Sequence, residues 1–201
     1  MPLEGTEDKV RDIFLIGCYT GQRFSDYHRI DESNIGFTQN VTKVIRLYQQ
    51  KTKSPVVIPI LNDELEVLLK KYNYCVPTIS EQKLNDYIKE ICRRLSESVP
   101  SLRGIERTLM TKTERELEQD KKRSYKHDGQ EQVIKYRWEM VASHTARRTM
   151  VTNMYLPRKF SLQQIMSVSG HKKEETLKRY LKLALDEFAD DVAREGSDGL
   201  F

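Results

Sequence analysis

The stretch from Ser143 to Tyr180 carries residue types that could attack a phosphate. It reads SHTARRTMVTNMYLPRKFSLQQIMSVSGHKKEETLKRY and contains, in order, His144, Arg147, His171 and Tyr180. His144 and Arg147 are three residues apart, so on a helix they share one face and could converge on one small anion. A single His-x-x-Arg pair arises easily by chance, whereas the whole ordered set does so much less easily.

Such a set suits displacement at a phosphodiester. The displacement adds negative charge to the phosphate oxygens, and two arginines can hold those oxygens through paired N–H donors. A protonated tyrosine, with a pKa of about 10, is a poor nucleophile. It needs a base and cationic surroundings, which His144, Arg147 and His171 would supply. The leaving sugar oxygen needs a proton, which a lysine on a hairpin can carry. Taken singly, His171 could instead be a helix-cap residue, and Tyr180 could be a packed tyrosine.

Other phosphate chemistries find less support in the sequence. Gly21 is not followed by the GK[ST] ending of a phosphate-binding loop, which disfavours nucleotide-dependent phosphoryl transfer. The acidic residues near the candidate site are scattered, so they do not indicate a two-metal nuclease. The sequence therefore predicts a site that uses neither a metal nor a cofactor.

Two segments nearer the N-terminus add candidates. Arg23 and Asp26 lie one helical turn apart, so Asp26 could hold the Arg23 guanidinium toward an anion, or the two could form a surface ion pair on a short helix. Lys51 falls at or near the tip of a predicted hairpin, where a lysine is commonly a plain turn residue. It could also reach into a cleft as a mobile general acid, and Lys53 competes for that role.

Hydrophobic periodicity and capping residues predict the elements that position these candidates. Thr6 is the expected N-cap of a helix that ends near residue 21, and strands over 42–48 and 56–60 flank a turn. Asn62 or Asp63 caps a helix that runs to about residue 72, and Ser80 caps a helix over 81–96. The polar segment 103–129 predicts a surface excursion that could touch DNA, with short strands at 108–110 and 124–126 around a charged connector over 113–123.

Three helices are predicted to carry the stretch that opened this section. Ser143 is the expected N-cap of the first, which stops before Pro157. Ser161 caps the second, over 162–168, and Gly170 ends it; the third spans 174–183. Residues 181–194 predict an amphipathic helix, followed by a frayed tail.

Composition allows several classes of partner. With 201 residues, 38% hydrophobic and 32% charged, the chain suits one globular domain with a real core. A net charge of +4 makes nucleic acid an option only. Three widely spaced cysteines without a CxxC pair argue against disulfides or a zinc site and fit a reducing cytoplasm. No apolar run reaches membrane-spanning length and no signal peptide is recognised, so we expect a cytoplasmic protein without a membrane partner.

Four segments resemble the tyrosine recombinase, or phage-type integrase, family, especially the branch carried by Bacteroides-type mobile elements. They are CYTGQRFSD, QKTKSPVVIPI, SHTARRT and SGHKKEETLKRY, and together they extend over nearly the whole chain. His171 precedes Tyr180 by nine residues, as the family pattern requires. Lys51 precedes Pro59 at the spacing of the family's catalytic lysine, which favours Lys51 over Lys53.

The resemblance implies an α+β, mostly α-helical catalytic-domain fold with a small antiparallel β-sheet. It also implies a role for each candidate: Arg23 and Arg147 bind the scissile phosphate, His144 is an acid/base, His171 supports the phosphate and Tyr180 is the nucleophile. Lys51 would protonate the 5′ hydroxyl and Asp26 would brace the site. Basic residues near the site are further candidates for contacting DNA: Lys53, Arg148, Lys172 and Lys173.

The implied function is site-specific recombination of double-stranded DNA through a 3′-phosphotyrosyl intermediate, for integration and excision of a mobile element. We expect residues 1–201 to be one catalytic domain without the family's N-terminal core-binding domain, with residues 183–201 a C-terminal helix and tail that a neighbouring copy could receive. The family works as a homotetramer on two DNA sites, whereas this fragment alone could be monomeric and bind DNA weakly. A type IB topoisomerase-like or telomere-resolving enzyme, or a non-catalytic DNA-binding module, stays an alternative.

Overall fold

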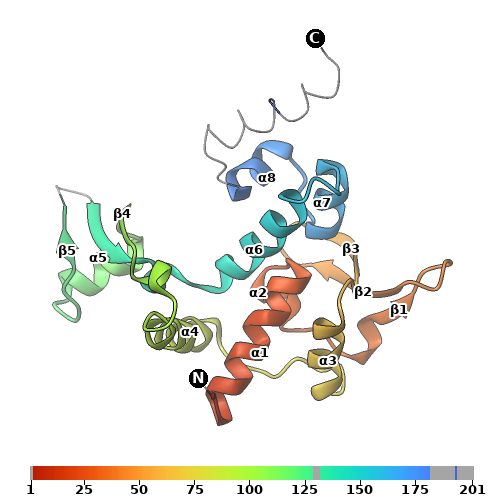
Figure 1. Ribbon diagram of the computed structural model, residues 1–201, viewed down its shortest axis with the longest axis horizontal. Helices are drawn as coiled ribbons and strands as arrows, with labels where there is room; N and C mark the ends of the chain where they lie inside the picture. Colours follow the sequence, from red (N-terminus) through yellow and green to blue (C-terminus); the bar gives the residue numbers. More distant parts are fainter. Residues whose placement is uncertain (1, 129–131, 182–192, 194–201) are drawn as a thin grey trace. The chain divides into compact units, whose positions relative to one another are not determined.

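The computed structural model describes residues 2–128, 132–181 and 193 (Figure 1). The chain divides into two compact units, each built from two stretches of sequence. Unit 1 comprises Met1–Phe14 and Pro77–Thr145, and unit 2 comprises Leu15–Val76 and Ala146–Phe201. Helices α1 (Gly5–Thr20) and α6 (Ser143–Tyr155) cross the boundary between the units. The predicted helix over 181–194 and the tail lie outside the described residues, as does the predicted end of the third helix at residue 183.

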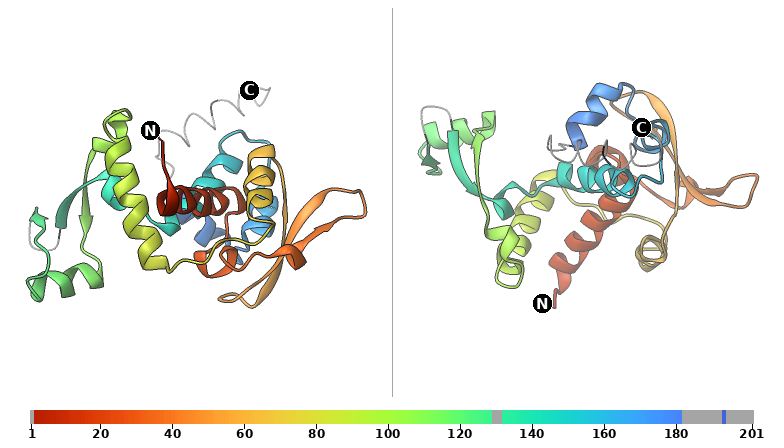
Figure 2. Two further views of the ribbon diagram at one scale, coloured as in Figure 1. Left: turned by 90° about the horizontal axis from the view of Figure 1, so that it is seen from below. Right: turned by 45° about the horizontal axis from the view of Figure 1, so that its top comes forward.

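Unit 2 contains a three-stranded antiparallel sheet in the order β1-β2-β3, drawn in orange in Figure 2. The strands are β1 (Ile35–Phe37), β2 (Lys43–Gln49) and β3 (Ser54–Pro59). From Ile45 to Gln49 of β2, alternate side chains are buried, so one face of this part of the strand packs inward. The two predicted strands are confirmed. Gln49 pairs with Ser54, so a turn of residues 50–53 joins β2 to β3 and carries Lys51.

Five helices shorter than α1 lie wholly or mostly in unit 2. They are α2 (Phe24–Tyr27), α3 (Asp63–Lys71), α6, α7 (Leu162–Ser169) and α8 (Glu174–Leu181). A buried cluster joins α6, α7 and α8; its members are Met150, Val151, Met154, Ile165, Leu177 and Leu181. Met150, Val151 and Met154 are thus the apolar side of α6.

The predicted caps in unit 2 are confirmed where the side chain acts within its own turn. The side chain of Asn62 accepts the amide of Leu65 at the start of α3. Ser161 accepts the amide of Gln164 in a reciprocal capping box at the start of α7. Gly170 ends α7 with a left-handed backbone at φ 72°, a conformation that glycine adopts at little cost.

Unit 1 holds α4 (Glu81–Leu95), capped by Ser80 as predicted, and a second antiparallel sheet, drawn in green in Figure 2. Its order is β4-β6-β5, with β4 (Ile105–Leu109), β5 (Lys126–His127) and β6 (Gln132–Tyr136). A short 3-10 turn, η2 (Pro100–Arg103), precedes β4, and another, η3 (Arg137–Met140), follows the central strand β6. The fold thus has two small sheets where one was predicted.

The prediction of an irregular charged connector over 113–123 is wrong. Most of this segment is a helix, α5 (Lys112–Gln119). Thr111 and Glu114 form a capping box that starts this helix. Glu114 also accepts two hydrogen bonds from the buried Lys135 of β6, at 2.6 and 2.7 Å. A lysine usually marks an exposed position, so the sequence does not show that Lys135 is on the buried side of a strand. For this reason β6 was not predicted.

Two predicted helix starts also differ. Ser143 does not cap its own helix: its hydroxyl donates to Glu81 and its backbone N–H donates to Asn85, both on α4. The backbone N–H and the hydroxyl of Ser143, at the start of α6, therefore find their hydrogen-bond partners on another helix of unit 1. At the other end of the chain α1 begins at Gly5, one residue before the predicted cap Thr6.

Replacing Gly170 should separate backbone strain from crowding. A Cβ at Gly170 would lie 2.3 Å from the Gln49 amide, whereas a Cβ at Gly5, also at positive φ, would meet nothing within 4 Å. We expect Gly5→Ala to cost about 1 kcal/mol of unfolding free energy and Gly170→Ala about 1–3 kcal/mol more. Urea unfolding of both variants measures the difference, and equal losses would contradict the crowding at Gly170.

Candidate functional site

Arg147 is the most deeply placed of the predicted site residues. It lies in α6 and its side chain is 0% exposed. Nη1 donates to the carbonyl of Gly21 at 3.1 Å and Nη2 lies 3.2 Å from Nε2 of His171. Nε is buried without a hydrogen-bond partner. Burial, and then repulsion from Arg23, lower the pKa of Arg147 to about 10, so the group remains a cation at neutral pH.

Arg23 supplies a second positive charge to the same site. It occupies the N-cap position of α2, and its Nη1 is buried without a hydrogen-bond partner. Its charge is close enough to Arg147 to disfavour the protonated form of that guanidinium. No ion pair joins either guanidinium to a carboxylate within residues 2–128 and 132–181. Two adjacent cations with unfilled donors form a site that suits an anion.

His171 is held between Ser169 and Arg147. The Ser169 hydroxyl donates its one hydrogen to the carbonyl of Ile165 at 2.6 Å, so it can only accept from Nδ1 of His171, 2.7 Å away. Nδ1 therefore carries the hydrogen. Nε2 is left as an acceptor that can receive a hydrogen bond from Arg147. The neighbours thus select one tautomer of a neutral His171.

Tyr180 lies beside both of these side chains. It belongs to α8, is partly buried, and packs against the apolar cluster of unit 2. The rings of His171 and Tyr180 meet edge to face with centroids 4.7 Å apart. The Arg147 guanidinium carbon lies 5.7 Å from the Tyr180 ring centroid, and a hydrogen bond with Tyr180 supports the charged form of Arg147. The phenol therefore sits among cationic and polar groups.

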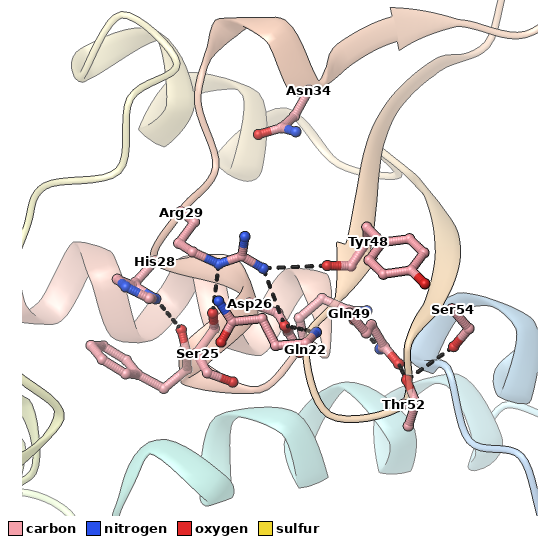
Figure 3. Close-up of polar contacts among 12 residues, drawn as sticks. Gln22, Ser25, Asp26, His28, Arg29, Asn34, Tyr48, Gln49, Thr52 and Ser54 are labelled. Atoms are coloured by element: carbon pink, nitrogen blue, oxygen red, sulfur yellow. Dashed lines mark hydrogen bonds and ion pairs between the residues drawn. The ribbon is translucent and has the colours of Figure 1, made fainter.

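Asp26 does not hold Arg23, and this part of the prediction is wrong. Figure 3 shows its side chain among other partners: Oδ1 accepts the backbone N–H of Gln50 at 2.8 Å and lies 3.4 Å from Nη2 of Arg29. Oδ2 is buried without a hydrogen-bond partner. The short helix α2 turns Asp26 toward the β2–β3 turn, so this carboxylate braces the turn that carries Lys51.

The remaining predicted residues lie at the surface. Lys51 is exposed in the β2–β3 turn, and Lys53 follows it there with φ 48°. His144 lies one helical turn before Arg147, on the part of α6 that belongs to unit 1, and its side chain is exposed. The candidates for contacting DNA are exposed or half-buried: Lys53, Arg148, Lys172 and Lys173. The structure thus brings together Arg23, Asp26, Arg147, His171 and Tyr180.

Sequence reasoning missed three buried polar residues at this site: Gln22, Gln49 and Ser169. Gln49 had a signal, since it falls on the inward side of a strand whose other inward residues are apolar. Gln22 had none, because its partners Gln49 and Val168 lie 27 and 146 residues away in sequence. Ser169 had a nearby signal in His171, its hydrogen-bond partner two residues later.

Two further properties concern the described part of the chain. None of its helices is long and apolar enough to cross a membrane. Within residues 2–128, 132–181 and 193, no group of three His, Cys, Asp or Glu side chains is arranged to hold a metal ion.

Comparison with known proteins identifies the family. The Phage integrase family matches residues 5–187, which is most of the chain. This chain belongs to the phage integrase family. A search of curated proteins gave no match.

Solved structures show the same fold. A post-cleavage complex of the XerH site-specific recombinase with palindromic difH substrate matches this integrase-family chain with a TM-score of 0.57 at 13% identity, covering 96% of this chain and 47% of that one. XerA recombinase matches with a TM-score of 0.50 at 14% identity, covering 97% and 65%. This chain thus spans about half the length of XerH.

Removing the Ser169 hydroxyl should change the balance between the two neutral tautomers of His171. In Ser169→Ala we expect the fraction of neutral His171 with hydrogen on Nδ1 to fall, because its acceptor is gone. Ring ¹⁵N shifts in NMR report that fraction directly. Ser167→Ala is the matched control, since Ser167 is exposed and donates only to Gln164. A wild-type His171 with its hydrogen on Nε2 would contradict the assignment.

Proposed function

We propose that this chain catalyses site-specific cleavage and rejoining of double-stranded DNA through a covalent bond to Tyr180. The observation that supports this most is the pair of guanidiniums with buried, unfilled donors beside a tyrosine. A phosphodiester would supply the missing acceptors. In a site shielded from water, such donors stabilise the charge that develops on the phosphate oxygens.

Each group then has one role in the reaction. The Tyr180 oxygen attacks phosphorus, and its proton passes to a base, which we assign to His144. The bond between phosphorus and the 5′ oxygen breaks, and that oxygen takes a proton from Lys51. Arg23 and Arg147 hold the phosphate oxygens, with His171 in support. The 3′-phosphotyrosyl bond conserves the energy of the phosphodiester, so rejoining is the reverse reaction and needs neither ATP nor a metal.

The cellular role we propose is integration and excision of a mobile element, by a homotetramer on two DNA sites. Membership of the phage integrase family supports recombination, and the similar fold of XerH, a site-specific recombinase bound to its difH substrate, agrees with it. We infer that this chain supplies the catalytic domain, and that basic side chains around the site contact the DNA backbone: Lys53, Arg148, Lys172 and Lys173.

The covalent step can be trapped on a nicked suicide duplex from the junctions of the parent element, at low salt and high protein concentration. We expect a slowly migrating adduct on a denaturing gel with the wild-type chain and none with Tyr180→Phe. Tyr155→Phe is the matched control, because Tyr155 packs against the same apolar cluster. An adduct that persists in Tyr180→Phe would refute the nucleophile, and a wild-type chain without any adduct would refute the proposed function.

The general acid can be identified with DNA whose bridging 5′ oxygen is replaced by sulfur, because a thiolate leaves without needing a proton. Lys51→Ala should slow cleavage of ordinary DNA by about 100-fold or more and leave cleavage of the sulfur-bridged DNA nearly unchanged. Lys53→Ala should slow neither reaction to that extent. A selective rescue of Lys53→Ala instead would transfer the role to Lys53.

A further inference from the structure

Two glutamines are completely buried at the junction of the segments that carry the site. Gln22 and Gln49 are each 0% exposed. Nε2 of Gln49 donates to Oε1 of Gln22 at 2.6 Å and to the carbonyl of Ser169 at 3.0 Å. Its Oε1 accepts the Thr52 hydroxyl at 2.5 Å. Figure 3 shows Gln49 between Gln22 and the turn that contains Thr52.

Gln22 completes this network on its other side. Its Nε2 donates to the carbonyl of Thr20 at 3.0 Å and to the carbonyl of Val168 at 2.8 Å. Both amide groups therefore use both of their N–H donors and their oxygen. Turning either amide over would bring oxygen against carbonyl oxygen, so the network has a single arrangement.

The network connects three segments that each carry a proposed catalytic residue. Gln22 directly precedes Arg23. Gln49 ends β2, two residues before Lys51, and Thr52 lies in the same turn. The carbonyls of residues 168 and 169 belong to the end of α7, just before His171. One set of buried hydrogen bonds thus links the backbones around all three residues.

The buried side chains of Gln49 and Asp26 both bond to the β2–β3 turn. Lys51 is exposed, and its amine lies at the end of a flexible four-carbon stem. The position of the turn backbone therefore sets the region that the amine can reach. Within the hairpin, the Lys53 carbonyl accepts from Tyr48, the Lys53 N–H donates to the Gln49 carbonyl, and the Thr52 hydroxyl accepts from Ser54. Two further bonds link the turn to buried side chains: Thr52 donates to Gln49, and the N–H of Gln50 donates to Asp26. A displacement of about 1 Å in a reacting group can cost about 100-fold in rate.

We propose that Gln49 is a positioning residue that fixes the Lys51 turn relative to Arg23 and His171. This inference rests on the proposed function, in which Lys51 gives a proton to the 5′ oxygen. Gln49 would act in that proton transfer only through the turn, and it would not touch DNA, because its side chain is wholly buried.

The test compares cleavage rates on ordinary DNA and on DNA with sulfur at the 5′ bridging position. Gln49→Met keeps the length of the side chain but removes its hydrogen bonds. Thr52→Val, at a half-buried position, removes the hydrogen bond from the turn to Gln49 and the acceptor of the Ser54 hydroxyl, but leaves the other bonds of Gln49 in place. It serves if Gln49→Met does not fold. Gln163→Met, on the exposed side of α7, is the matched control. Circular dichroism and thermal melting show which variants are folded.

A misplaced general acid slows only the reaction that needs a proton. We expect the ratio of the sulfur rate to the oxygen rate to rise about tenfold or more in Gln49→Met, in the same direction but less in Thr52→Val, and not at all in Gln163→Met. If a folded Gln49→Met, or Thr52→Val where Gln49→Met does not fold, keeps the wild-type ratio, Gln49 has only a structural role and the proposal fails. Failure of the proposed function looks different, since the wild type would then cleave neither DNA.

Discussion

The site depends on the burial of a positive charge that forms no ion pair with a carboxylate among the described residues, although the charge of Asp26 favours it. Arg147 is wholly enclosed, and its own contacts in the fold are a carbonyl oxygen, a neutral imidazole and a phenol. Such burial is costly, and it lowers the pKa of the group. The cost is consistent with a site that is completed by an anion. It also constrains the neighbours, because a charged His171 would add a third cation to Arg147 and Arg23.

Ser169 is the neighbour that meets this constraint. By directing its single hydrogen to the helix carbonyl of Ile165, it makes Nδ1 of His171 the donor and leaves Nε2 to face Arg147. The end of α7 therefore does two things: the left-handed Gly170 turns the chain, and the residues on either side of it orient the imidazole. The backbone geometry and the protonation of this site are set by the same turn.

Prediction from the sequence succeeded for local features and failed for distant ones. The caps Asn62, Ser80 and Ser161 bond within one turn of themselves, so the spacing of residues is sufficient to recognise them. Ser143 has equally good capping chemistry, yet it bonds to two residues of α4 that lie 58 and 62 positions away in sequence. Asp26 is spaced to reach Arg23 but bonds to Gln50. In both cases a better placed partner from another segment replaced the local one.

The sequence by itself determined the residue types, their order and the elements that carry them, because these follow from short-range periodicity, capping and motif spacing. Only the tertiary structure decided the burial of Arg147, the partners of Asp26 and the tautomer of His171. It alone brought Gln22 and Gln49 together with the end of α7, through hydrogen bonds that span 120 and 146 residues. The physical reason is that burial and hydrogen-bond satisfaction are properties of the packed chain, and no local pattern encodes which distant group will fill a given donor.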